Sequence, residues 1–238
     1  MTTEADLAEQ LATLIAGEVK RKPELVLALP TGNTPLPLYR ELARRCAKGE
    51  LTFRKAHAFS LDEFKGLDPE DPGSFYAYLQ RHFYGHVDVH PSRIHFFDGL
   101  AEHAVAQCQR YERELSEVGG IDLAVLGIGV NGHVAFNEPS DALQPRTHVV
   151  KLSRPTREAN AVLFGDDPAK VPTEAYTIGM ATLLSAKRIA LIATGEAKAE
   201  ILAQALRGPV TTQCPASFLQ LHANVTLFAD AAARAKLS

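Results

Sequence analysis

One stretch of the sequence combines glycines with side chains that can move protons. It runs from Gly127 to Pro139 and includes Gly129, Asn131, His133 and Glu138. Its glycines leave room for a ligand against the backbone, and an imidazole exchanges protons near neutral pH. The stretch has no serine or cysteine nucleophile and no metal-ligand spacing. Proton transfer, as in an isomerisation or an elimination, is therefore the chemistry that it favours.

A second candidate for proton transfer is the acidic pair Asp62 and Glu63, which follows the apolar segment 57–61 directly. A carboxylate at the end of a buried strand acts as a general base when its pocket tunes its pKa. A helix cap or a loop position is the commoner use of such acids. The sequence leaves both interpretations open.

A glycine turn between a buried apolar run and a helical pattern suggests an anion site. Its residues are Thr31, Gly32, Asn33 and Thr34. We expect Thr34 to be the N-cap and Pro35 the first helical residue, with free N–H groups that favour phosphate. Lys198 stands at the start of a later helix, where the helix dipole disfavours a cation unless an anion binds there. An ordinary capped turn and a surface lysine are the alternatives, but together the two features predict a phosphate clamp.

The elements that position these residues alternate along the chain. Apolar runs predict strands at 25–29, 57–61, 93–97, 121–126, 188–193 and 224–229, a strand leads into a short helix over 175–185, and helical patterns fill most intervals and 231–237. This alternation predicts an open, doubly wound, mostly parallel α/β sheet flanked by helices, as a single domain over 1–238. Ligands bind beyond the carboxyl ends of the strands in such sheets. The polar segments fall there, so we expect one shared site.

Composition narrows the class of protein. The 238 residues are 46% hydrophobic and 22% charged, and the net charge of −3 lacks the basic excess of a nucleic-acid binder. We expect no membrane span and no signal peptide, because no apolar run reaches about 18 residues and the first residues are acidic. Cys46, Cys108 and Cys214 form no paired motif, which favours free thiols, a cytoplasmic location and no zinc. A dinucleotide dehydrogenase is disfavoured, because no G-x-G-x-x-G follows a strand.

Three strings carry a family resemblance: Leu29-Pro30-Thr31-Gly32-Asn33-Thr34-Pro35, Leu61-Asp62-Glu63-Phe64, and Gly132-His133-Val134-Ala135-Phe136-Asn137-Glu138-Pro139. They resemble the signatures of glucosamine-6-phosphate deaminases, and the likeness continues through Arg146-Thr147, Thr156-Arg157 and Gly195-Glu196-Ala197-Lys198. The related 6-phosphogluconolactonases share the fold and the Gly-His pair. They typically continue with Ser-Leu-Phe-Pro, and this difference favours the deaminase.

The resemblance implies conversion of glucosamine 6-phosphate and water to fructose 6-phosphate and ammonia, without a metal or an organic cofactor. Asp62 would move a proton between C2 and C1 of the sugar. His133 would assist ring opening and would be oriented by Glu138 and Asn131. Gly32, Asn33, Thr34 and Lys198 would hold the phosphate.

Two departures from the family pattern affect these roles. Many members have Asp where this chain has Asn131, whose amide oxygen we expect to accept the imidazole N–H without adding charge. We therefore expect His133 to be harder to protonate than in an Asp version. Some members have a phosphate-binding Arg at the position of Val162. Either the nearby Arg157 substitutes for it or the clamp relies on Lys198.

The segment 148–172 corresponds to a mobile lid in the family. Longer, allosterically activated members carry basic residues where this chain has His148 and Val150. We therefore expect no activation by N-acetylglucosamine 6-phosphate. A lactonase on the same fold and a non-catalytic sugar-phosphate sensor are the alternative functions, and the sequence does not give the number of subunits. In each case the expected partner is a small sugar phosphate, not a nucleic acid or a membrane.

Overall fold

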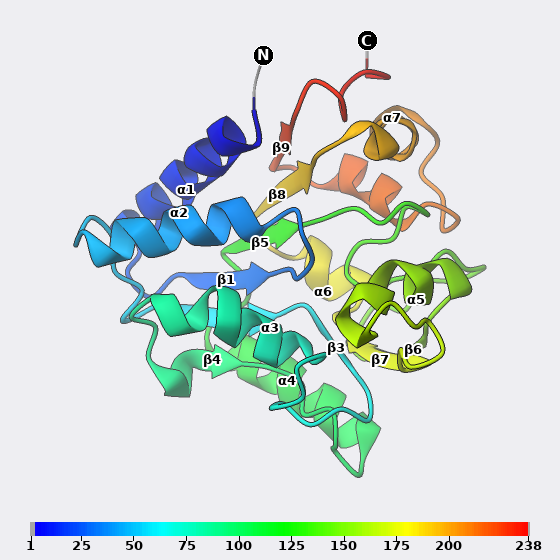
Figure 1. Cartoon of the computed structure of the whole chain (residues 1–238), viewed down its shortest axis with the longest axis horizontal. Helices are drawn as coiled ribbons and strands as arrows, with labels where there is room; N and C mark the ends of the chain where they lie inside the picture. The colour runs from blue at the N-terminus through cyan, green and yellow to red at the C-terminus, as the bar shows by residue number, and fades with distance from the viewer. Residues whose placement is uncertain (1–2, 238) are drawn as a thin grey trace.

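Six short strands form one parallel sheet in the computed structural model, which describes residues 3–237. The sheet has the order β4-β2-β1-β5-β8-β9. Its strands are β1 (Val26–Leu29), β2 (His57–Ser60), β4 (Ile94–His95), β5 (Leu123–Leu126), β8 (Arg188–Ala193) and β9 (Val225–Ala229). This arrangement confirms the predicted mostly parallel α/β fold (Figure 1).

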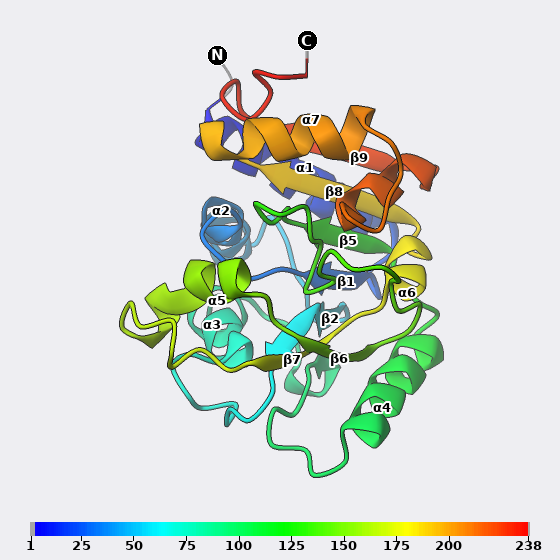
Figure 2. The ribbon, with the colours of Figure 1, turned by 90° about the vertical axis from the view of Figure 1, so that its right-hand side faces the viewer.

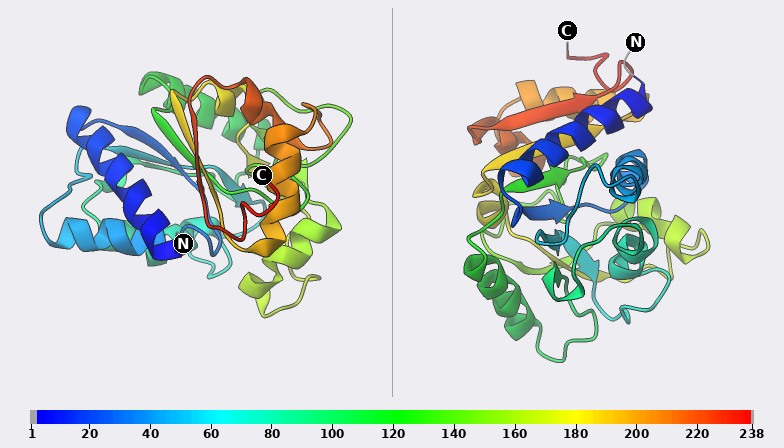
Figure 3. Two further views of the ribbon diagram at one scale, coloured as in Figure 1. Left: turned by 90° about the horizontal axis from the view of Figure 1, so that it is seen from above. Right: turned by 90° about the vertical axis from the view of Figure 1, so that its left-hand side faces the viewer.

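Helices cover both faces of this sheet, which explains why its strands are apolar without alternation. Along β1, Val26 and Ala28 pack into one core and Leu27 and Leu29 into the other. Figure 3 (left) shows α1 and α7 on opposite sides of the strands. One face carries α1 (Glu4–Arg21), α2 (Leu36–Ala47) and α3 (Phe75–His82), and the other carries α4 (Ala104–Glu117), α6 (Met180–Leu184) and α7 (Ala199–Arg207).

A second, antiparallel sheet lies beside the first and was not predicted. Its order is β3-β7-β6, with β3 (Asp62–Phe64), β6 (His148–Lys151) and β7 (Glu174–Thr177). Leu61 joins the two sheets, because its N–H donates to Leu29 in the parallel sheet and its carbonyl accepts from Ile178 beyond β7. The expected strand at the start of 175–185 therefore belongs to the small sheet. Figure 2 shows β3, β6 and β7 together, with α3 and α5 (Arg154–Asn160) beside them.

Two local expectations are wrong. Helix α2 begins at Leu36 with Pro35 as its N-cap and without a side-chain cap, so Thr34 is not the capping residue. The segment 231–236 forms turns in place of the expected helix, because so short a segment gains too few hydrogen bonds to offset helix nucleation.

Short 3-10 helices complete the chain: η1 (Tyr84–His86), η2 (Pro91–Arg93), η3 (Ala161–Phe164), η4 (Glu196–Lys198) and η5 (Pro215–Leu221). Over residues 3–237, none of the helices combines the length and the apolar character needed to cross a bilayer.

Candidate functional site

The segments singled out from the sequence surround one cavity of about 340 Å³ at the carboxyl ends of the parallel strands. The predicted residues that line it are Thr31, Gly32, Asn33, Thr34, Asp62, Gly129, His133 and Lys198. Asn131, Glu138 and Arg157 are not part of its wall. The fold thus brings together residues that lie more than 160 positions apart in the chain, as the topological argument predicted.

The turn after β1 presents backbone donors to the cavity. Within residues 3–237, the N–H groups of Gly32, Asn33 and Thr34 have no hydrogen-bond partner. Gly32 has a φ of 96°, which favours glycine and allows the chain to turn sharply between strand and helix. Successive free N–H groups in such a turn form a concave site for an anion.

Two tyrosines fix the orientation of this turn. The hydroxyl of Tyr39 on α2 donates to the carbonyl of Pro30, and the hydroxyl of Tyr78 on α3 donates to the carbonyl of Gly32, each at 2.5 Å. The C=O and N–H of a trans peptide point in opposite directions. The N–H groups of Thr31 and Asn33 therefore point away from the tyrosines. Sequence reasoning missed both tyrosines, because an aromatic residue on a helix suggests only core packing.

Lys198 adds a positive charge to the same cavity. Its Nζ donates to the carbonyl of Ile128 at 2.6 Å, and no carboxylate of residues 3–237 forms an ion pair with it. Burial lowers the pKa of Lys198, because the charged form is poorly solvated there. A half-buried cation without a counter-ion favours an anionic ligand, which agrees with the predicted phosphate clamp.

Asp62 lies on β3 with its side chain in the cavity, and the residue is 7% exposed. Its carboxylate makes no hydrogen bond to any part of the chain that the structure describes. Burial, and secondarily the charge of Glu63, raises the pKa of Asp62 well above its usual range. A carboxylate with a raised pKa takes up a proton more readily than an ordinary aspartate, as a general base requires.

Glu63 has a different role from its neighbour, because successive residues of a strand point to opposite sides. Its carboxylate accepts backbone N–H groups from Phe64 at 2.8 Å and from Phe75 and Tyr76 at 2.9 Å. The last two donors are the first residues of α3. The helix-capping alternative that the sequence left open therefore applies to Glu63, whose pKa burial raises to about 7.

The ring of His133 lies directly over Gly129. A Cβ atom at position 129 would lie only 2.4 Å from the ring, so glycine provides the space for the imidazole. The N–H of Gly129 is already paired with the carbonyl of His133 at 2.9 Å. Burial lowers the pKa of His133, the positive charge of Lys198 lowers it further, and the carboxylate of Glu138 opposes both effects.

Asn131 contacts Glu138 and not the ring. Its Nδ2 donates to Oε2 of Glu138 at 2.7 Å, and its Oδ1 accepts the backbone N–H of His133 at 3.2 Å. The expectation that this amide oxygen accepts the imidazole N–H is therefore wrong, since the backbone already occupies it. Glu138 itself stays 3.8 Å from Nδ1 of His133, which is too long for a hydrogen bond.

Two hydroxyls at the start of α5 were missed from the sequence. Ser153 is the N-cap, and its Oγ lies 3.2 Å from each oxygen of Glu138. Oγ1 of Thr156 lies 3.5 Å from Nδ1 of His133. A serine directly before a helical segment is a helix-start signal, but nothing local indicates which carboxylate it meets. Val162, where the family resemblance implied a basic residue in some members, is 62% exposed.

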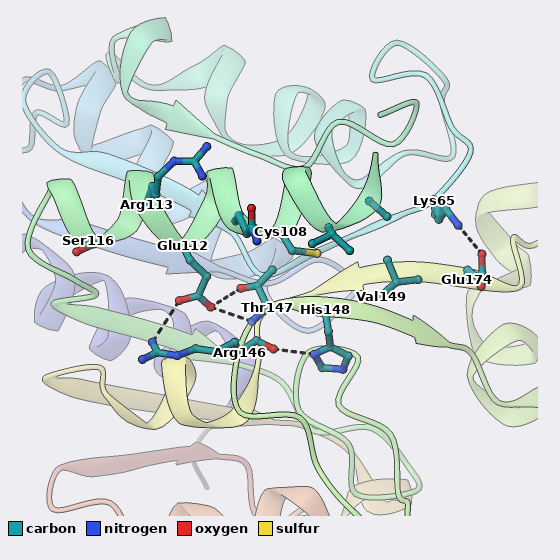
Figure 4. Close-up of a pocket in the computed structure, with 13 residues that line it drawn as sticks. Lys65, Cys108, Glu112, Arg113, Ser116, Arg146, Thr147, His148, Val149 and Glu174 are labelled. Atoms are coloured by element: carbon teal, nitrogen blue, oxygen red, sulfur yellow. Dashed lines mark hydrogen bonds and ion pairs between the residues drawn. The ribbon is translucent and has the colours of Figure 1, made fainter. Parts of the chain in front are cut away.

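A larger hollow, about 810 Å³, lies between α4 and β6 (Figure 4). None of the predicted catalytic or phosphate-binding residues lines it. Its charges largely satisfy one another: Glu112 accepts from Thr147 at 2.7 Å and faces Arg146, and Lys65 pairs with Glu174 at 2.7 Å. The smaller cavity therefore remains the candidate active site.

Comparison with known proteins gives consistent matches. The model of the family described as glucosamine-6-phosphate isomerases/6-phosphogluconolactonase matches residues 2–228. A glucosamine-6-phosphate deaminase of Halothermothrix orenii is 45% identical over 94% of this chain and 93% of its own. A glucosamine-6-phosphate deaminase of Bacillus velezensis is 44% identical over 94% of this chain and 93% of its own.

Solved structures agree. A monomeric glucosamine-6-phosphate deaminase superposes with a TM-score of 0.95 and 40% identity, covering 99% of this chain and 98% of its own. A 6-phosphogluconolactonase from Trypanosoma brucei has a TM-score of 0.76 but only 19% identity, covering 100% and 97%, so it shares the fold alone.

Proposed function

The chain belongs to the family of glucosamine-6-phosphate isomerases and 6-phosphogluconolactonases, and from this premise we propose that it is a glucosamine-6-phosphate deaminase. The reaction converts glucosamine 6-phosphate and water to fructose 6-phosphate and ammonia. The observation that carries the proposal is that Asp62 and His133 line the same cavity as the anion-binding turn and Lys198.

In this proposal the phosphate binds the N–H groups of Gly32, Asn33 and Thr34 and the ammonium of Lys198. The phosphate lies at C6, away from the carbons that react. Its binding energy can therefore position C1 and C2 without taking part in the chemistry. Arg157 does not line the cavity, so in this proposal the phosphate is held without it.

Ring opening comes first. The C1–O5 bond breaks, the C1 hydroxyl loses its proton as the aldehyde forms, and O5 gains a proton. His133 is the group placed to carry this proton, because its ring lies in the cavity and burial lowers its pKa, which favours the neutral ring. The negative charge of Glu138, which is held by Asn131, favours the protonated ring and so partly offsets the effect of burial on the pKa of His133.

Isomerisation then needs a separate base. Asp62 takes the proton from C2 of the open chain while O1 gains a proton, which gives an enolamine whose double bond joins C1 and C2. Asp62 then delivers its proton to C1, and the amino group loses one proton as the C2–N double bond forms. The resulting imine at C2 adds water and releases ammonia, so that atoms balance without an oxidant or a reductant. A carboxylate with a raised pKa suits both the acceptance and the return of this proton.

The test is an ammonia-release assay with glucosamine 6-phosphate on the parent and on Asp62→Asn. We expect the variant to lose about 10²–10⁴-fold in kcat, with KM little changed because the base acts in the transition state. Absence of ammonia release by the parent, together with hydrolysis of 6-phosphogluconolactone, would replace the proposal with the lactonase alternative.

The segment 148–172 supplies Pro155, Thr156 and Asn160 to the wall of the cavity. We propose that it acts as the lid and that the chain forms a single functional unit over 1–238. We also propose a cytoplasmic location, because charged sugar phosphates do not cross membranes unaided and Cys46, Cys108 and Cys214 are free thiols. Hydrogen exchange that slows over 148–172 when substrate analogue binds would support the lid.

A further inference from the structure

Glu138 and His133 do not touch, although the family resemblance gives the carboxylate the task of orienting the ring. Their nearest atoms, Oε2 and Nδ1, lie 3.8 Å apart. Both side chains are held from other directions: Asn131 donates to Glu138 at 2.7 Å, and the ring of His133 fills the space over Gly129. The carboxylate and the imidazole therefore share no direct hydrogen bond.

The side chains at the N-terminus of α5 fill that gap. Oγ1 of Thr156 lies 3.5 Å from Nδ1 of His133 and 3.0 Å from Oγ of Ser153. Oγ of Ser153 in turn lies 3.2 Å from both carboxylate oxygens of Glu138. Thr156 is 2% exposed, so water does not compete freely for these contacts.

Counting the available protons gives this series of hydrogen bonds one direction. A hydroxyl has a single proton to donate. Ser153 is placed to donate either to Glu138 or to Thr156. When its single proton goes to the anionic Glu138, the bond between the hydroxyls is donated by Thr156. Oγ1 of Thr156 is then left as an acceptor toward Nδ1–H of His133. This tautomer leaves Nε2 of the neutral ring free to accept a proton, as ring opening requires.

We propose that Ser153 and Thr156 are positioning residues that connect Glu138 to His133 through a two-hydroxyl bridge. The inference rests on the proposed function for its catalytic meaning, but the bridge itself is a property of the free protein. Both hydroxyls belong to the segment 148–172, so the placement of that segment and the tautomer of the ring are linked. The charged groups that face the ring are Glu138 and Lys198, and Asp62 lines the same cavity.

The competing interpretation is that these hydroxyls only cap α5. Ser153 does accept the backbone N–H of Thr156 at 3.3 Å, and loss of a cap destabilises a helix. Thr156→Val separates the two interpretations, because the cap uses the backbone of Thr156 and not its hydroxyl. Thr156→Ser retains the hydroxyl. Thr182→Val is a matched control, since it removes another buried hydroxyl. That hydroxyl donates to Glu112 at 2.7 Å and does not belong to the bridge.

The first measurement is the pKa of His133 in the free protein, determined by NMR titration of ¹⁵N-labelled histidine. In Thr156→Val we expect this pKa to fall by about one unit, because the protonated ring loses its acceptor toward Glu138. Ser153→Ala should lower it as well. Thr156→Ser and Thr182→Val should leave it at the parent value. An unchanged or raised pKa in both Thr156→Val and Ser153→Ala would overturn the bridge.

The second measurement is the kinetics of ammonia release. We expect Thr156→Val to lower kcat by about tenfold with KM unchanged. Because the hydroxyls act in series, the double variant Ser153→Ala, Thr156→Val should be no slower than the slower single variant. Additive losses would contradict the bridge. If the parent releases no ammonia, the proposed function fails, and the NMR titration still decides whether the bridge exists.

Discussion

Replacing Gly129 by alanine tests the geometry of the proton shuttle with one methyl group. The φ of Gly129 lies outside the left-handed region, so alanine fits the backbone there. The added Cβ would nevertheless lie 2.4 Å from the ring of His133, whereas ordinary contact begins at 3.4 Å. The ring must therefore retreat by about 1 Å, a displacement that costs about 100-fold when it misplaces a reacting group.

We expect Gly129→Ala to lower kcat for ammonia release by about 100-fold while the protein stays folded. Gly17→Ala is the matched control, because Gly17 is an exposed helical glycine whose added Cβ meets nothing within 4 Å. It should retain full activity and gain about 0.5–1 kcal/mol of stability. Circular dichroism melting and a coupled ammonia assay measure both effects. Activity of Gly129→Ala within about threefold of the parent would refute the placement of the ring.

Three further predictions concern charge and regulation. Lys198→Met should raise KM for the sugar phosphate by about 10–100-fold, because a charge-assisted hydrogen bond is lost; a titration of initial rates measures it. Burial, with the charge of Arg93, lowers the pKa of His57. The folded state therefore binds a proton at His57 more weakly than the unfolded state does, and the free energy of unfolding falls as the pH drops below about 6.5. Urea unfolding at several pH values should show that His57→Gln loses less stability than the parent as the pH falls. Addition of N-acetylglucosamine 6-phosphate should not raise the rate, because His148 and Val150 offer no cationic pair; a large activation would contradict this.

The sequence predicted the parallel sheet and the place of the site for the same physical reason. A strand buried on both faces must be apolar throughout, and its polar continuation then marks the edge where ligands bind. The small antiparallel sheet escaped prediction, because β3 has three residues and β6 and β7 have four each. β6 and β7 have polar residues at both ends and lack the continuous apolar run of β1 and β5, and β3 pairs with β7 across more than 100 positions, which leaves no local signal.

Within the site, residue types were easier to predict than their partners. Asp62 and His133 were predicted as a pair from the pattern of strand ends, and they line one cavity. The contacts of Asn131 were not predictable, because an amide next to a histidine in sequence can face either the ring or another acid. The hydroxyls of Ser153 and Thr156 reach Glu138 and His133 only through the packing of α5, which depends on tertiary structure.

The tyrosines behind the anion-binding turn have a consequence for how this end of the site tolerates mutation. In the proposed phosphate clamp, recognition uses peptide N–H groups, which every residue except proline possesses, so most exchanges at Asn33 that preserve the backbone should be harmless. Loss of the phenol hydroxyl at Tyr39 or Tyr78 would instead release a peptide plane that points its donor inward. The shape of this turn therefore depends most on two side chains that are not part of the cavity wall.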